Sequence, residues 1–143
     1  PAPAPPAPAP ADPSSGAVGA YRAARETALG TPNAGADPEE LAQAVVADAL
    51  SGRTQAIDQL LIATEGARAR TRALTPPSPA ATLHRDTLTL LDQTLRVYGA
   101  LRSSIASGDI AGIAGLQTDA NKLERAARDV EAETRRLREA HGG

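Results

Sequence analysis

One stretch decides the fold of this chain: residues 101–140, LRSSIASGDIAGIAGLQTDANKLERAARDVEAETRRLREA. Within it, Ser107-Gly108-Asp109 places a glycine that can end one helix directly before an aspartate that can cap the next. This order predicts a tight turn between two helices. Apolar residues then recur with a heptad spacing, so we expect residues 110–140 to form one long helix.

This last helix is predicted to carry two columns of core residues. One column has large side chains, at Leu116, Leu123, Val130 and Leu137. The other is mostly small, at Ile113, Ala120, Ala127 and Thr134. Because small side chains let two helix axes approach closely, we expect tight antiparallel packing against the preceding helix.

Prolines bound that preceding helix. Pro76, Pro77 and Pro79 stop one helix and start the next, which we expect to run from about residue 80 to residue 105. Its apolar residues form a wide face, which we interpret as a docking surface for a protein partner or a second copy of the chain, at Leu88, Leu91, Leu95 and Tyr98. The alternative is that another helix of the same chain covers this face.

Two further helices are predicted on the N-terminal side of the prolines. Asp37-Pro38-Glu39-Glu40 is a helix start, with a capping aspartate, a proline at the first position and acids against the helix dipole. The apolar spacing continues to Leu74 through Ser51-Gly52, which favours one kinked helix over two, although a break at Gly52 is the alternative. Residues 17–29 predict a short helix that buries little.

The first thirteen residues contain seven prolines and five alanines, which is typical of a polyproline II spacer. We therefore assign residues 1–16 to a tether and residues 17–143 to one domain. The expected fold of the domain is an all-α, antiparallel up-down bundle of three long helices and a short leading one. Because the first residue is not Met, the sequence fits a processed exported chain or a fragment with an interdomain linker.

Composition excludes several functional classes. The chain has 143 residues, a net charge of −2 and no Cys, so disulfides and thiolate metal sites are absent. No apolar run is long enough to span a bilayer, and the near-neutral charge argues against nucleic-acid binding. Ala supplies 32 residues, whereas Leu, Val, Ile and Tyr together supply only 27. This thin core favours a stabilising protein partner or self-association.

Catalytic and metal-binding patterns are also missing. The two histidines, His84 and His141, lack the Glu three residues earlier that carboxylate-bridged di-iron bundles use. A mononuclear site would have to combine them with Asp86 or Glu139. No strained serine elbow or phosphate-binding glycine loop is present. We therefore expect no catalytic residue, no metal and no cofactor.

Basic residues gather at one pole of the predicted bundle. The site that we predict for an anionic partner, such as an envelope polymer or lipid head groups, consists of Arg68, Arg70, Arg72, Arg85, Arg135, Arg136 and Arg138. The competing explanation is ordinary helix electrostatics, because cations are favoured at helix C-termini and Glu131 can pair with Arg135.

Residues 75–140 resemble helical-hairpin modules found in exported bacterial proteins of unknown function. The resemblance is carried by Pro76-Pro77, His84, the leucine-rich helix, the Ser107-Gly108-Asp109 turn and the Ala/Leu return helix. It implies a location in the periplasm or cell envelope, with the cytoplasm as the alternative. We predict a non-enzymatic structural or accessory interaction module, such as a small subunit of a larger complex. The alternatives are a binding protein for an anionic polymer or small ligand and, third, an enzyme.

Overall fold

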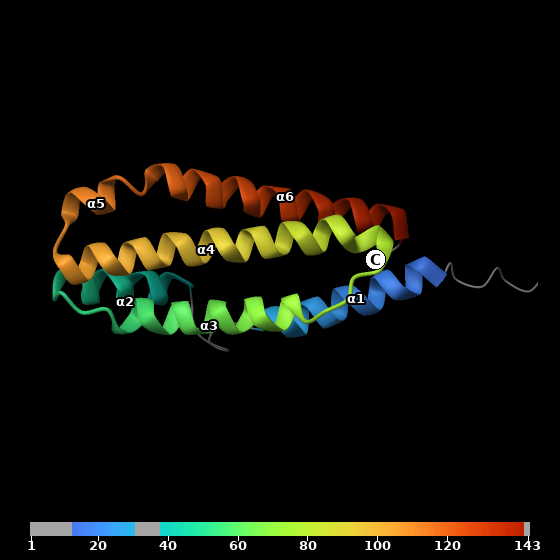
Figure 1. Ribbon diagram of the computed structural model, residues 1–143, viewed down its shortest axis with the longest axis horizontal. Helices are drawn as coiled ribbons and strands as arrows, with labels where there is room; N and C mark the ends of the chain where they lie inside the picture. Colours follow the sequence, from blue (N-terminus) through green and yellow to red (C-terminus); the bar gives the residue numbers. More distant parts are fainter. Residues whose placement is uncertain (1–12, 31–37, 142–143) are drawn as a thin grey trace, which may run out of the picture.

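The regular structure of the chain is helical throughout the described residues. The computed structural model describes residues 13–30 and 38–141. The elements are α1 (Pro13–Leu29), α2 (Pro38–Leu50), α3 (Gln55–Arg72), the 3-10 turn η1 (Ser78–Ala80), α4 (Ala81–Ser107), α5 (Ile110–Ala114) and α6 (Gln117–His141). These helices pack together, which confirms the all-α expectation (Figure 1).

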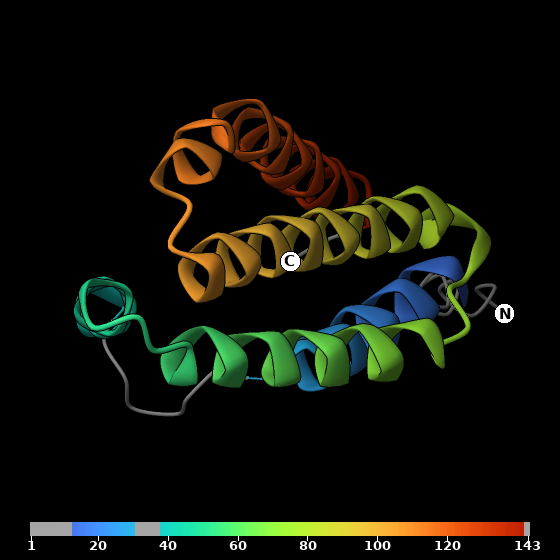
Figure 2. The ribbon, with the colours of Figure 1, turned by 60° about the vertical axis from the view of Figure 1, so that its left-hand side comes forward.

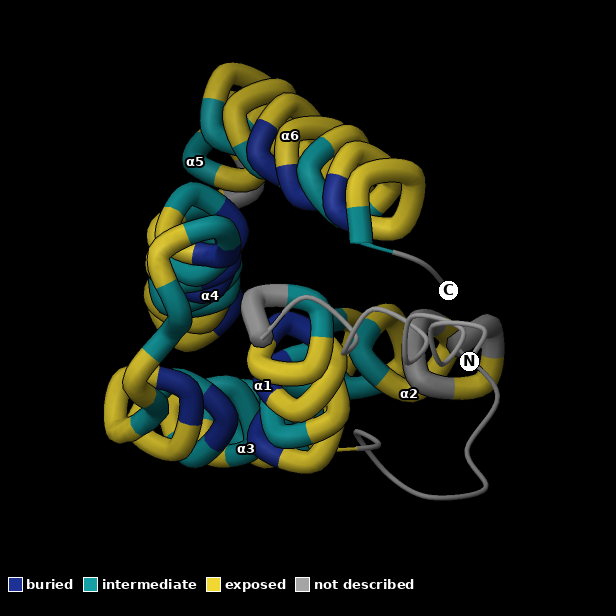
Figure 3. The backbone as a smooth tube through the Cα atoms, turned by 90° about the vertical axis from the view of Figure 1, so that its right-hand side faces the viewer, coloured by how far each residue is buried: buried dark blue, intermediate teal, exposed yellow. Residues whose placement is uncertain are grey.

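The long helix α4 is central. It contacts α6 on one side and α3 on the other, and α1 lies against α3 and α6 (Figures 1 and 3). The short helix α2 contacts α3 and is turned away from the direction of the long helices (Figure 2). At one end of the molecule, α1 thus meets the end of α6 and the η1 turn that precedes α4 (Figure 1).

A cluster of buried apolar residues lies at that end. It joins α1, η1, α4 and α6, through Val18, Tyr21, Ala80, Leu83, Val130 and Leu137. The expectation that the first helix buries little was therefore wrong, since Val18 and Tyr21 lie one turn apart on the face that enters this core. The predicted tether extends to residue 16, whereas α1 already begins at Pro13. The rest of the tether, residues 1–12, lies outside the described residues.

Gly52 separates α2 from α3, so the prediction of one kinked helix was wrong and the alternative break is correct. Gly52 has φ +70°, in the left-handed region that favours glycine and interrupts a right-handed helix. The Asp48 side chain spans the break and accepts a hydrogen bond of 2.8 Å from the backbone N–H of Ala56.

The turn at Ser107-Gly108-Asp109 is confirmed. Gly108 has φ +69° and ends α4, and the Asp109 carboxylate accepts a hydrogen bond of 2.9 Å from the N–H of Gly112. The single long helix predicted after it was wrong, because α5 ends after five residues and α6 begins at Gln117. Glycine is less favourable than alanine in a helix interior by about 1 kcal/mol, and two glycines, Gly112 and Gly115, lie where this helix is interrupted.

The predicted column of small residues lies on the wrong side of α6. Ala120 and Ala127 are exposed, and the buried alanine is their neighbour Ala126. The column of large residues faces inward as expected, with Val130 and Leu137 buried. The rotation of α6 against α4 therefore buries Ala126, three positions after Leu123, rather than Ala127, four positions after it.

Candidate functional site

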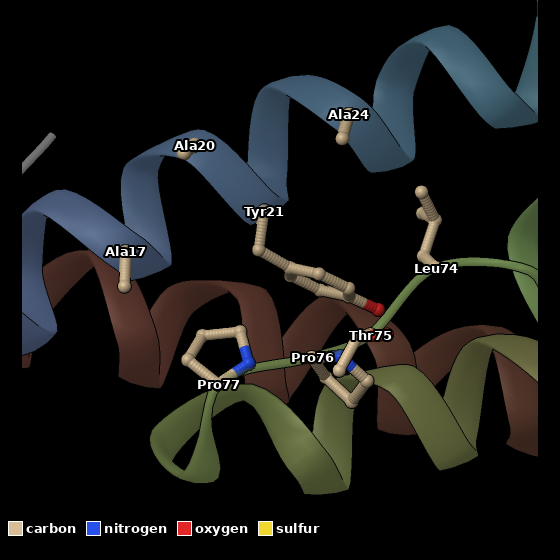
Figure 4. Close-up of a pocket in the computed structure, with 8 residues that line it drawn as sticks. All are labelled: Ala17, Ala20, Tyr21, Ala24, Leu74, Thr75, Pro76 and Pro77. Carbon is tan, nitrogen blue, oxygen red and sulfur yellow. The ribbon is translucent and has the colours of Figure 1, made fainter.

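A groove lies between α1 and the linker that joins α3 to η1 (Figure 4). Its volume is about 440 Å³, and it is lined by Ala17, Ala20, Tyr21, Ala24, Leu74, Thr75, Pro76 and Pro77. The three alanines follow one another on one face of α1, and their short side chains leave the space open. No charged residue lines the groove.

The opposite wall is formed by a linker with little capacity to collapse onto α1. Pro76 and Pro77 lack backbone N–H groups, and Pro77 is extended, with φ −65° and ψ 157°. The carbonyl of Pro77 accepts a hydrogen bond of 2.9 Å from the N–H of Ala80, which fixes the linker where η1 begins. The groove therefore has one helical wall and one extended wall.

Tyr21 connects the groove with α4. Its ring lines the groove, and its hydroxyl lies 2.8 Å from the Nδ1 atom of His84. The two rings meet edge to face, with centroids 5.8 Å apart. Burial raises the pKa of the Tyr21 hydroxyl, against the opposing effect of Arg25, and burial lowers the pKa of His84. Both groups are therefore neutral near pH 7.

A second polar contact joins α1 and α4 one helical turn further along. The Nε atom of Arg25 donates a hydrogen bond of 2.8 Å to Oγ1 of Thr87, and burial lowers the pKa of Arg25. Arg25 follows Tyr21 by four residues and Thr87 follows His84 by three, so the two contacts are successive steps along the same helix pair.

Two contacts hold the ends of α1. Ser15 Oγ lies 3.3 Å from Nδ1 of His141 on α6, and Nε of Arg70 on α3 donates a hydrogen bond of 2.8 Å to the carbonyl of Ala28. His84 and His141 thus each meet a hydroxyl group on α1. Within residues 13–30 and 38–141, no group of three or more His, Asp or Glu side chains is arranged to hold a metal ion.

The arginines predicted to bind an anionic partner are mostly engaged within the chain. Arg68 pairs with Asp92, Arg70 binds the carbonyl of Ala28, and Arg136 binds Glu133 at 2.9 Å. Arg85 and Arg135 lie at 4.0 Å and 3.9 Å from Asp86 and Glu131. Only Arg72 and Arg138 of this set have no hydrogen bond or ion pair to another described residue.

Acidic residues also lie among these arginines. Burial raises the pKa of the Asp86 carboxyl, Arg85 opposes this effect, and the nearby charges of Asp129 and Glu133 add to it. The pole predicted to be basic therefore contains both signs of charge, and the two arginines without internal partners are its most available cations.

The predicted apolar docking face on α4 lies largely inside the molecule. Leu91 is buried, and Leu88, Leu95 and Tyr98 are half-buried, on the helix that contacts both α3 and α6. Among the residues whose burial is described, the exposed large apolar side chains lie on other helices, at Val46, Leu50, Ile62 and Ile113. Sequence reasoning missed Val46 and Leu50, because it assigned α2 to a longer helix packed along its full length.

The groove was also missed from the sequence. Ala17, Ala20 and Ala24 share one helix face, but a row of alanines does not reveal whether another segment fills the space beside it. No protein-family model, curated protein or solved structure matches this chain. None of the described helices is both long enough and apolar enough to cross a membrane.

Proposed function

We propose that this protein is a non-enzymatic interaction module that binds an uncharged, proline-rich segment in the groove between α1 and the linker. The observation that carries the proposal is the groove itself, about 440 Å³ in volume and lined without charged residues. A charged segment would lose solvation there without gaining a partner, whereas an apolar one would not.

The lining favours proline over longer apolar side chains. Proline-rich segments in the polyproline II conformation dock in shallow grooves that present aromatic rings, and they bind with a low entropic cost because the conformation is preformed. Here the ring of Tyr21 extends from α1 toward Pro76 and Pro77, beside the alanine methyl groups of the same helix (Figure 4). Such a surface fits flat pyrrolidine rings.

The wider setting of this module is proposed from the sequence. We take the bundle to be an antiparallel up-down arrangement, acting as a structural or accessory subunit of a larger complex in the bacterial cell envelope. The resemblance of residues 75–140 to exported helical hairpins supports this location.

A peptide titration tests the groove. The probe is a synthetic peptide, PAPAPPAPAP, which has the sequence of residues 1–10. We expect it to shift the amide resonances of Ala17, Ala20 and Leu74 in the isotope-labelled chain. A parallel titration uses a chain that lacks residues 1–12. If the chain's own N-terminal segment occupies the groove, it competes with the peptide, so the peptide should bind more tightly to the shortened chain. If a partner supplies the segment, the two chains should bind the peptide equally.

Two variants of α1 make this test specific. Ala20→Leu fills the groove and should abolish the shifts, whereas Ala23→Leu adds the same side chain at an exposed position outside the lining and should not. The proposal is wrong if the unmodified chain and the variants Ala20→Leu and Ala23→Leu show equal shifts. It is also wrong if a glycine-serine peptide of the same length gives the same shifts.

Binding to an anionic surface is a second candidate function. It is favoured by Arg72 and Arg138, which are without partners among the described residues and are exposed.

A further inference from the structure

We infer that α1 is a pH-sensitive clasp, in which protonation of His84 weakens the contact between Tyr21 on α1 and α4 and so loosens one wall of the groove. The inference concerns the regulation of the proposed binding site, and to that extent it rests on the proposed function. Tyr21 links His84 to the groove, since its ring lines the groove and its hydroxyl lies 2.8 Å from Nδ1 of His84.

The hydrogen bond with Tyr21 defines what protonation changes. With Nδ1 unprotonated, His84 accepts the hydrogen of the Tyr21 hydroxyl, so the ring proton is on Nε2. A proton on Nδ1 turns this acceptor into a donor and forces the hydroxyl to rotate. It also places a positive charge in a seam where Arg25 already supplies a cation one helical turn away.

Charged groups on the surrounding helices do not offset this charge. These helices carry, among others, Arg22, Arg25 and Glu26 on α1, Arg68, Arg70 and Arg72 on α3, Arg85 and Asp86 on α4, and Asp129, Glu133, Arg136 and His141 on α6, and none of these groups is among the causes of the pKa shift of His84. Glu133 is bound by Arg136, and Asp86 has Arg85 beside it. Burial alone shifts the pKa of His84, and it does so downward.

The sign of the pH dependence follows from this direction. With α1 detached, His84 regains its ordinary pKa near 6.5, so the detached state binds more protons than the attached state as the pH falls through that value. Attachment therefore weakens toward acid pH and is strongest above about pH 7. The polar contact with His84 adds to the apolar packing of Val18 and Tyr21, so its loss should lower the local stability of α1.

Hydrogen exchange of the full chain tests the clasp directly. We expect the amides of α1 to lose protection between about pH 7.5 and about pH 5.5 after correction for intrinsic exchange rates. His84→Gln keeps a polar side chain that does not titrate, and its α1 protection should be equal at the two pH values. His141→Gln, which removes the histidine of α6 that meets Ser15 on α1, should keep the response of the wild type.

A direct titration keeps the inference testable if His84→Gln fails to fold. The imidazole resonances of His84 in the wild-type chain should titrate at a lower pH than they do in urea. The clasp is overturned if His84 titrates at the same pH in both states, or if His84→Gln retains the pH response of α1.

The clasp and the proposed function can fail separately. A pH-dependent loss of α1 protection with no peptide binding at either pH would leave the clasp standing and refute the binding proposal. Peptide binding of equal strength at both pH values, with unchanged α1 protection, would do the reverse.

Discussion

The Nε atom of Arg25 on α1 donates a hydrogen bond of 2.8 Å to the hydroxyl of Thr87 on α4. Thr87 is fully buried, and its hydroxyl in turn donates to the carbonyl of Leu83 at 2.7 Å. The contact therefore sets an arginine side chain against a neutral partner inside a seam between two helices. Such an arrangement is tolerated only while its polar groups remain paired.

Replacing one of these two side chains should lower the free energy of unfolding more than replacing both. We expect Thr87→Val to destabilise the chain by about 1–3 kcal/mol, because it leaves Nε of Arg25 buried without an acceptor. Arg25→Met removes the charge and retains most of the volume, so the double variant should recover part of the loss. Urea unfolding followed by circular dichroism measures these differences. Thr94→Val is the control, since Thr94 bonds only to the carbonyl of Leu90 in its own helix among the contacts described.

Replacing either of two glycines near the turn with alanine should change the stability of the chain, in opposite directions at the two positions. A Cβ at Gly112 would lie 2.6 Å from the Asp109 carboxylate and 2.8 Å from Oγ of Ser104, so Gly112→Ala should displace the cap and destabilise the chain by about 1 kcal/mol. At Gly115 the nearest atom is 3.4 Å away and φ is −70°, so Gly115→Ala should be neutral or stabilising by up to about 1 kcal/mol. Equal effects in thermal unfolding would contradict this reasoning.

Asp58 should contribute to the acid sensitivity of the bundle. The hydrogen bond from Arg102 on α4, aided by one from Thr54, lowers the pKa of the Asp58 carboxyl. The stabilising effect is therefore present above the ordinary pKa of about 3.8 and is lost as the pH falls below it. Asp58→Asn should flatten the dependence of the unfolding midpoint on pH below about 4. Glu131 is exposed on α6, so Glu131→Gln serves as the control with the same change in charge.

The anionic-partner hypothesis makes a prediction about two arginines. Replacing both Arg72 and Arg138 with Gln should weaken binding to vesicles that contain anionic lipid, by about 1 kcal/mol for each charge, and the loss should shrink as salt is added. The matched control replaces Arg125 and Arg128, which are exposed nearer the middle of α6, and has the same net charge. If both double variants lose affinity equally, only net charge matters and the pole is not a site.

The sequence predicted best where a local signal fixes a local structure. Gly108 and Asp109 form the expected turn because a left-handed glycine and a capping carboxylate act within a few residues of each other. The prolines from Pro76 to Pro79 end α3 and begin α4 for the same kind of reason. At Gly52 and Gly115 the helix is interrupted, but the apolar spacing continues across the interruption. A prediction based on that spacing therefore gives helices that are too long.

The sequence by itself determined that the chain is helical and where its main turn lies, since capping, proline and periodicity act along the backbone. Only the tertiary structure decided which alanines are buried, because Ala126 and Ala127 are chemically identical and the rotation of α6 against α4 chooses between them. It likewise decided that Tyr21 meets His84, 63 residues away, and that a groove remains beside Tyr21. These features depend on how whole helices fit against one another, which no local pattern specifies.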